Sequence, residues 1–207
     1  IGQIMKAGRH LLALINDLLD ISSIEAGGTE LTIEAIDAGE LMDEVHALAA
    51  PIVAAAGLAF VLERPAAQLV IRADRRRVVQ VMLNLIANAA KYNRTGTKVR
   101  LACLLAGDAV RVEVEDDGTG IDPADAGRLF TPFDRLGQQS RARVEGTGLG
   151  LALSKRLIES MGGRIGYEAP ASGGARFWFA LPVASPAQPL PVPALAGAAA
   201  AAERASG

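Results

Sequence analysis

The sequence predicts an α+β fold: a two-layer sandwich of one mostly antiparallel sheet and one helical layer, preceded by one long helix. Two observations carry this prediction. The runs "KVRLACLLAG" and "AVRVEVED" alternate like strands, and Gly107-Asp108 joins them as in a hairpin. The run 74–92 instead repeats its apolar residues with a helical period. Because helices and hairpin-connected strands mix along the chain, we expect a helical layer on an antiparallel sheet.

The first 26 residues, "IGQIMKAGRHLLALINDLLDISSIEA", read as one helix that Gly27-Gly28 closes. Its apolar stripe is too broad for a simple surface helix, so we expect it to pack in a helical bundle. From residue 183 the chain is rich in Pro and Ala without a core pattern, as in a linker or tail. The predicted organisation is therefore a helix at 1–27, one domain at 28–182 and a tail at 183–207.

Within the domain, the elements follow from caps and periodicity. Asp37 is expected to cap a helix at about 38–56, which Pro51 interrupts, and Asp74 to cap the helix that ends near Tyr92. Further helices are expected near 123–129 and from about Thr147 to Met161. The expected strands are 31–37, 58–63, 69–73, 98–107, 109–116, 163–169 and 175–182. The expected core positions of the helix 74–92 are Val78, Val81, Met82, Leu85, Ile86 and Ala89.

Composition excludes several classes of function. The net charge is −2 and the 21 basic residues are dispersed, so no nucleic-acid partner is expected. The single cysteine, Cys103, lies in an apolar run, which predicts a core residue, excludes an internal disulfide and suits a reducing compartment. No apolar run reaches the roughly 18–20 residues of a membrane span. We expect a cytoplasmic domain. Whether a membrane anchor lies outside this sequence stays an open question.

Polar residues gather on one face of the helix 74–92. Asn84, Asn88 and Lys91 lie at i, i+4 and i+7 in "NLIANAAKYN" and share that face. One interpretation is an ordinary solvent-facing surface, although asparagine is a poor helix former there. The other is a site in which amide oxygens and the lysine hold a hydrated cation and a phosphate. This segment alone leaves both open.

Two glycine-rich segments lie at the ends of predicted elements. "DDGTGI" (116–121) follows a strand, and alone it is more typical of a turn than of a site. "GTGLGLALSKRL" (146–157) enters a helix, where unpaired N–H groups and the helix dipole suit a phosphate. A flexible linker is the alternative, but a linker would not continue directly into a helical pattern.

Together with "LFTPFDR", these segments resemble the catalytic ATP-binding domain of sensor histidine kinases, within the class that includes gyrase, heat-shock-90 and mismatch-repair ATPases. The resemblance covers roughly residues 30–182, and "GGARFWFALP" is similar to the last strand of that family. Residues 1–26 resemble the second helix of the dimerisation and phosphoacceptor hairpin. The resemblance implies ATP and Mg²⁺ as cofactors, a response-regulator receiver domain and the phosphoacceptor helix as partners, and a homodimer in the complete protein.

The resemblance also implies roles for individual residues. Asp116 would accept a hydrogen bond from the adenine amino group, which favours ATP over GTP, while Gly118 and Gly120 let the backbone approach the base. Asp117 receives no role. The remaining assignments are Asn88 as the Mg²⁺ ligand, Asn84 as a supporting or water-orienting ligand, Lys91 as a phosphate contact, and Tyr92 as a residue either lining the nucleotide or packing in the core.

For the lid, the resemblance implies that the segment Gly146, Thr147, Gly148, Leu149 and Gly150 faces the phosphates. Phe130 and Phe133 either tether a mobile lid at 134–147 or simply anchor in the core. Arg141 and Arg143 of that lid would reach toward the γ-phosphate.

The sequence departs from the family at the phosphoacceptor. Neither His10 nor His46 lies in an acceptor-like context, so both are expected to be structural, and the acceptor helix is expected outside this sequence. Two other functions compete with the kinase: a nucleotide-binding regulatory module without transfer, and a hydrolysing ATPase. The presence of the candidate metal and phosphate contacts argues against a regulatory module without transfer. A hydrolysing ATPase requires a glutamate base four residues before the asparagine that binds the metal, where this chain has Asn84.

Overall fold

The computed structural model describes residues 31–93, 95–134 and 147–184, together with the isolated positions Gly8, Ile15 and Leu19. Its strands are β1 (Glu34–Asp37), β2 (Ala59–Glu63), β3 (Val70–Ala73), β4 (Lys98–Ala106), β5 (Ala109–Asp116), β6 (Arg164–Glu168) and β7 (Ala175–Pro182). Its helices are α2 (Ala38–Ala55), α3 (Arg75–Tyr92), α4 (Pro123–Ala126) and α5 (Gly150–Ser160). The helix predicted at 1–27, the tail beyond 184 and most of the predicted lid lie outside the described residues.

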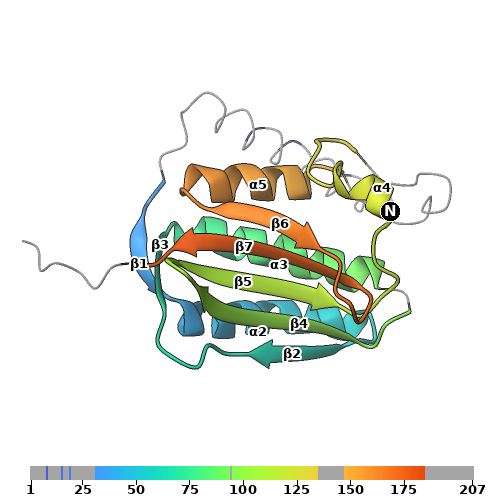
Figure 1. Ribbon diagram of the computed structural model, residues 1–207, viewed down its shortest axis with the longest axis horizontal. Helices are drawn as coiled ribbons and strands as arrows, with labels where there is room; N and C mark the ends of the chain where they lie inside the picture. The colour runs from blue at the N-terminus through green and yellow to red at the C-terminus, as the bar shows by residue number, and fades with distance from the viewer. Residues whose placement is uncertain are drawn as a thin grey trace, which may run out of the picture.

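Five strands form the main sheet in the order β2-β4-β5-β7-β6. The β2–β4 pair is parallel and the other pairs are antiparallel, which confirms the mostly antiparallel sheet. Figure 1 shows α2 and α3 behind this sheet and α5 beside its β6 edge. A separate two-stranded sheet of β1 and β3 was not anticipated. This small sheet contacts the segment after β7. Val183 forms an isolated β-bridge with Ile71, and the Ala184 N–H donates to the Val70 carbonyl.

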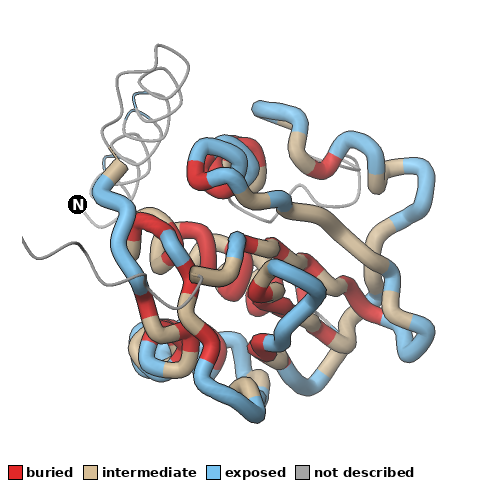
Figure 2. Tube along the Cα trace, turned by 60° about the vertical axis from the view of Figure 1, so that its left-hand side comes forward, coloured by how far each residue is buried: buried red, intermediate tan, exposed pale blue. Residues whose placement is uncertain are grey.

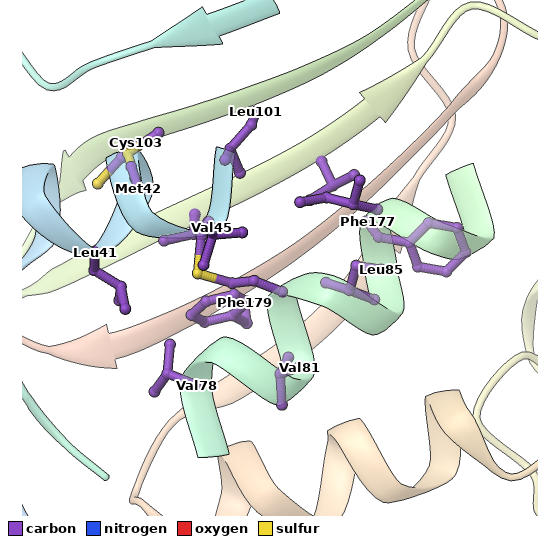
Figure 3. Close-up of a cluster of buried hydrophobic side chains, with 14 of the residues drawn as sticks. Leu41, Met42, Val45, Val78, Val81, Leu85, Leu101, Cys103, Phe177 and Phe179 are labelled. Carbon is purple, nitrogen blue, oxygen red and sulfur yellow. The ribbon is translucent and has the colours of Figure 1, made fainter. Parts of the chain in front are cut away.

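The core lies between the helices and one face of the sheet. Figure 2 shows buried segments on the inner sides of the helices and strands, and Figure 3 shows apolar side chains of α2, α3, β4 and β7 meeting there. All six core positions expected in α3 are buried, as is Cys103. Burial raises the pKa of the Cys103 thiol to about 11, which suits the predicted role of core residue.

The opposite face of the sheet carries a network of ion pairs. Glu115 accepts from Arg100 at 2.8 Å and from Arg176 at 2.6 Å, while Arg111 donates to Glu168 at 2.7 Å. Charged and apolar residues alternate along β5 because successive side chains point to opposite faces. The two faces are thus distinct: one carries the core and the other is polar.

Several predicted boundaries were wrong. The helix α2 continues through Pro51, because the buried residues Ala49 and Val53 on either side of the exposed proline keep its inner face packed. The last helix begins at Gly150 rather than Thr147, because Gly148 takes a left-handed φ of 73° that ends any helix before it. The first strand begins at Glu34, and α4 ends at Ala126. Among the described residues, no helix is both long and apolar enough to cross a membrane.

Candidate functional site

The strand β5 ends in a buried carboxylate. Asp116 is 8% exposed, and its Oδ1 accepts the backbone N–H of Gly118 at 3.0 Å. Burial raises the pKa of Asp116, and the negative charges of Asp117 and Glu115 raise it further, against the lowering effect of backbone hydrogen bonds. A desolvated carboxylate with few donors is a strong acceptor for an incoming N–H group.

The glycines beside Asp116 are required by the packing of the chain on itself. A Cβ on Gly118 would lie 2.9 Å from both Asn93 Oδ1 and Asp116 Oδ1. Gly120 has a φ of 72°, and its Cβ would lie 2.7 Å from the carbonyl oxygen of Gly174. Gly174, at φ 82°, packs in turn against the backbone of Asp116. The glycines therefore permit close packing of this loop against the β6–β7 connection, while the predicted approach of the backbone to a base stays a prediction.

Asp117, for which no role was expected, accepts hydrogen bonds from three residues. It receives hydrogen bonds from the Thr97 hydroxyl at 2.7 Å, the Thr97 N–H at 2.8 Å, the Lys98 N–H at 2.9 Å and Asn93 Nδ2 at 3.1 Å. Burial acts to raise the pKa of Asp117, but these bonds outweigh it and hold the pKa well below its usual range. Asp117 thereby ties the segment after α3 to the loop that contains Asp116.

The polar face of α3 lies toward α5. Asn84 donates through Nδ2 to Ser154 Oγ at 2.9 Å, and its Oδ1 occupies the position that a Cβ on Gly150 would need. Asn84 is thus engaged in holding α5 against α3. Asn88 and Lys91 are half-buried one and two turns further on, beside Asn84 on the same face. Tyr92 is 40% exposed with Lys91 Nζ 5.2 Å from its ring centre, so the core alternative for this tyrosine is wrong.

The start of α5 differs from the starts of the other described helices. The carboxylates of Asp37, Asp74 and Asp122 cap α2, α3 and α4, whereas the N-cap residue of α5, Leu149, provides no side-chain cap. Ahead of it, the Thr147 hydroxyl accepts the Leu149 N–H at 3.1 Å, and Leu149 itself is buried. Uncapped N–H groups and the helix dipole give this end a positive potential.

The segment that contains Phe130 and Phe133 is attached to the start of α5. The Phe133 N–H donates to the Gly148 carbonyl at 3.0 Å, although the Phe133 side chain is 61% exposed and its φ is 62°. Phe133 therefore holds this segment through its backbone and is not a core anchor. Phe130 is the apolar contact, edge-on to Phe177 at 6.5 Å. Gly146, Arg141 and Arg143 lie outside the described residues.

The structure thus brings together the end of β5, the second half of α3 and the start of α5. Asn93–Asp117 links the first two, and Asn84–Ser154 links the last two. The result has a buried acceptor, Asp116, at one end, and Lys91 and the uncapped start of α5 at the other. Sequence reasoning missed Asn93, Asp117, Ser154 and Gly174, because their partners are distant in the chain. The only signals for them were Asn93 at the end of α3 and the Gly173-Gly174 pair.

Comparison with known proteins identifies the class of this domain. The family model of histidine kinase-, DNA gyrase B- and HSP90-like ATPases matches residues 73–185. The chain belongs to this family of ATPases. The matched range contains all of α3 and the strands and helices that carry the site.

The similar proteins include sensor histidine kinases. The chain is 39% identical over 185 residues to the non-motile and phage-resistance protein of Caulobacter vibrioides, covering 87% of this chain and 22% of that protein. It is 36% identical over 205 residues to the sensor histidine kinase GacS of Pseudomonas protegens, covering 95% and 22%. The chain therefore spans about a fifth of the length of these relatives.

Solved structures of histidine kinases have the same fold. Full-length ShkA in complex with AMPPNP matches with a TM-score of 0.75 and 34% identity, over 89% of this chain and 38% of that one. The histidine kinase ThkA in complex with the response regulator TrrA matches with a TM-score of 0.69 and 26% identity, over 89% and 50%. The α+β sandwich is thus the fold of a histidine kinase catalytic domain.

We expect Asp117→Asn to lower the free energy of unfolding by about 1–2 kcal/mol at pH 7, because a half-exposed carboxylate with several donors is replaced by a neutral amide. The folded pKa of Asp117 lies below the 3.8 of the free side chain, so its contribution is present above that value and is lost as the pH falls through the folded pKa. Urea unfolding at neutral and acidic pH measures both effects.

The matched control is Asp43→Asn, which removes a carboxylate from an exposed ion pair with Arg64. That substitution should change stability little at either pH. Equal losses in the two variants would contradict the role of Asp117.

Proposed function

We propose that this chain is the ATP-binding catalytic part of a two-component sensor histidine kinase. It would transfer the γ-phosphate of ATP to a histidine on the hairpin helix, for relay to an aspartate of a response regulator. The observation that carries the proposal is the pairing of a buried acceptor, Asp116, with an uncapped helix start at α5 across the polar face of α3. Such a site recognises a purine amine at one end and phosphates at the other.

The base end would select adenine. The Asp116 carboxylate accepts hydrogen bonds and donates none, so it pairs with the exocyclic amine of adenine and repels the carbonyl of guanine. Because burial has already removed much of its water, the carboxylate gives up little hydration when the amine arrives. Gly118 and Gly120 keep the backbone beside it free of side chains.

The phosphate end would bind through three kinds of group. The backbone N–H groups at Gly148 and Gly150 and the Lys91 ammonium would contact phosphate oxygens, while the Thr147 hydroxyl, which accepts the Leu149 N–H, shapes the turn. Asn88 presents a half-buried amide on the same face. The amide oxygen of Asn88, phosphate oxygens and water would together hold Mg²⁺, which prefers oxygen ligands. Bound Mg²⁺ would neutralise charge that develops on the transferred phosphoryl group.

The position of Asn84 distinguishes transfer from hydrolysis. An amide cannot deprotonate water, and the Nδ2 group of Asn84 is hydrogen-bonded to Ser154. The described site thus positions ATP and stabilises charge, while the nucleophile would be an imidazole from the hairpin. Asn84 would then support the site by holding the start of α5 in place and orienting water near Asn88.

The comparisons support the wider assignments. The ShkA structure holds the ATP analogue AMPPNP, and the ThkA structure holds a response regulator, so we assign ATP and a receiver domain to this chain as ligand and partner. We also propose that the complete protein is a homodimer through the hairpin to which residues 1–27 contribute. Use of ATP and the free thiol of Cys103 favour a cytoplasmic location.

We expect Asp116→Ala to bind ATP about ten- to hundredfold more weakly, because a charge-assisted hydrogen bond to the base is lost. The domain should remain folded, since the substitution also removes a desolvated carboxylate. Isothermal titration measures the affinity, and Asp108→Ala, at the opposite end of β5, is the control that should bind normally.

The affinity of the wild-type protein should also fall as acid protonates Asp116, whose pKa is raised. Unchanged ATP affinity in folded Asp116→Ala would refute the base contact.

We expect Asn88→Ala to keep adenosine affinity but to lose most of the strengthening that Mg²⁺ gives to ADP binding. The base contact comes from β5, whereas the metal would join the phosphates to α3. Titrations of ADP with and without Mg²⁺ measure this difference. Gln80→Ala, two turns earlier on α3, is the matched control. An undiminished effect of Mg²⁺ in Asn88→Ala would remove Asn88 from the metal site.

We expect the chain to leave His10 and His46 unmodified when given Mg-ATP alone, and to phosphorylate a separately supplied hairpin that carries the acceptor histidine. His46 stacks on Phe60 at 4.4 Å, a structural contact, and His10 lies outside the described residues. Transfer in trans should be slow because the effective concentration of a tether is lost. Labelled ATP with mass-spectrometric mapping locates the phosphate. Stoichiometric phosphate on His10, or none on the hairpin, would contradict the proposal.

A further inference from the structure

The side chain of Asn93 joins two distant segments of the chain at the end of α3. Asn93 follows the last residue of α3 and is 6% exposed. Its Nδ2 group donates to the Lys98 carbonyl at 3.0 Å and to Asp117 Oδ1 at 3.1 Å, while its Oδ1 accepts the Gly96 N–H at 2.8 Å. Because two acceptors meet the nitrogen and a donor meets the oxygen, the amide has one favourable orientation.

This side chain does not serve to end α3. The Asn93 backbone N–H donates to the Ala89 carbonyl at 3.0 Å, so the helix is completed through the main chain. A side chain that capped the helix end would bond its last carbonyls, whereas the Asn93 amide bonds the segment 95–98 and Asp117. A Cβ on Gly96 would collide with Asn93 Oδ1 and Asp117 Oδ1, so these three residues are in close contact.

The same side chain lies against the loop that carries Asp116. A Cβ on Gly118 would lie 2.9 Å from Asn93 Oδ1 and 3.3 Å from Asn93 Cα. The Gly118 N–H donates to Asp116 Oδ1 at 3.0 Å, so this peptide group holds the carboxylate. Asn93 thus meets the loop twice, by packing at Gly118 and by a hydrogen bond at Asp117. The direction in which the Asp116 carboxylate faces therefore depends on where Asn93 holds the loop.

We propose that Asn93 is a positioning residue for adenine recognition, which holds the loop 116–118 so that the Asp116 carboxylate faces the base. The proposal rests on the proposed ATP-binding function and includes no contact between Asn93 and the nucleotide. A hydrogen bond weakens steeply when its angle departs from linear, so a carboxylate on a displaced loop binds the purine amine less well. The phosphate end is independent of this loop, because the Asn84–Ser154 hydrogen bond holds α5 against α3.

The test is Asn93→Ala in the full chain, with affinities measured by titration calorimetry. We expect ATP and adenosine to bind about three- to tenfold more weakly, the effect of weakening one hydrogen bond. Inorganic tripolyphosphate with Mg²⁺ should bind as to the wild type, because it has no base. In an Asp116→Ala background, Asn93→Ala should cause no further loss of ATP affinity, because the group that it positions is absent. Asn93→Ser, which retains a polar side chain, serves the same test if Asn93→Ala does not fold.

Asp74→Ala is the matched control at the other end of α3. Asp74 is also a buried polar residue, 8% exposed, and it accepts the Arg77 and Thr32 N–H groups at 3.1 Å. Its substitution should lower the thermal unfolding temperature and leave ATP affinity unchanged, which separates a general loss of stability from displacement of the loop. Equal ATP affinity of the folded Asn93 variant and wild type would overturn the inference while the proposed function stands. An equal loss for tripolyphosphate, for Asp74→Ala or in the Asp116→Ala background would do the same. Failure of the wild-type protein to bind ATP would overturn both.

Discussion

The helical period of α3 is the constraint on which the rest of the domain depends. Its apolar residues at 0–6% exposure must face α2 and the sheet, and Leu85, Ile86 and Ala89 are among them. With 3.6 residues per turn, Asn84, Asn88 and Lys91 then have to lie on the opposite side. One helix therefore serves as core and as site, and any rotation that exposed the apolar face would also displace the polar one.

The site is assembled by contacts that are local in space and distant in sequence. Asn93 and Asp117 join the end of α3 to the end of β5, and Asn84 and Ser154 join α3 to the start of α5. Backbone contacts of Gly118, Gly120 and Gly174 close the space around Asp116. These bonds satisfy the neighbouring donors and acceptors, and the proposed ligand contacts are Asp116 and the start of α5. This separation of supporting from contacting groups is the arrangement expected of a pre-organised site.

The buried carboxylate of Asp116 carries a cost for the unliganded domain. Desolvation raises its pKa, which means that the charged form is less stable here than in water. The packed core of buried apolar residues supplies the stability that the site does not. A residue that is unfavourable for the fold and well placed for a ligand is typical of binding sites, where stability and function oppose each other.

The sequence by itself determined the fold class and the core face of α3, because these depend on short-range periodicity and on capping aspartates that are visible in a few adjacent residues. The segments of the candidate site were predicted instead from the family resemblance that their motifs carry together. The sequence could not determine that Asp117 supports the loop, that Phe133 acts through its backbone, or that α2 would continue through Pro51. Tertiary structure decided these points, because each depends on a partner many residues away: Thr97 and Lys98 for Asp117, Gly148 for Phe133, and the sheet for α2. Hydrogen-bond partners and packing neighbours follow from the folded geometry, which local pattern does not encode.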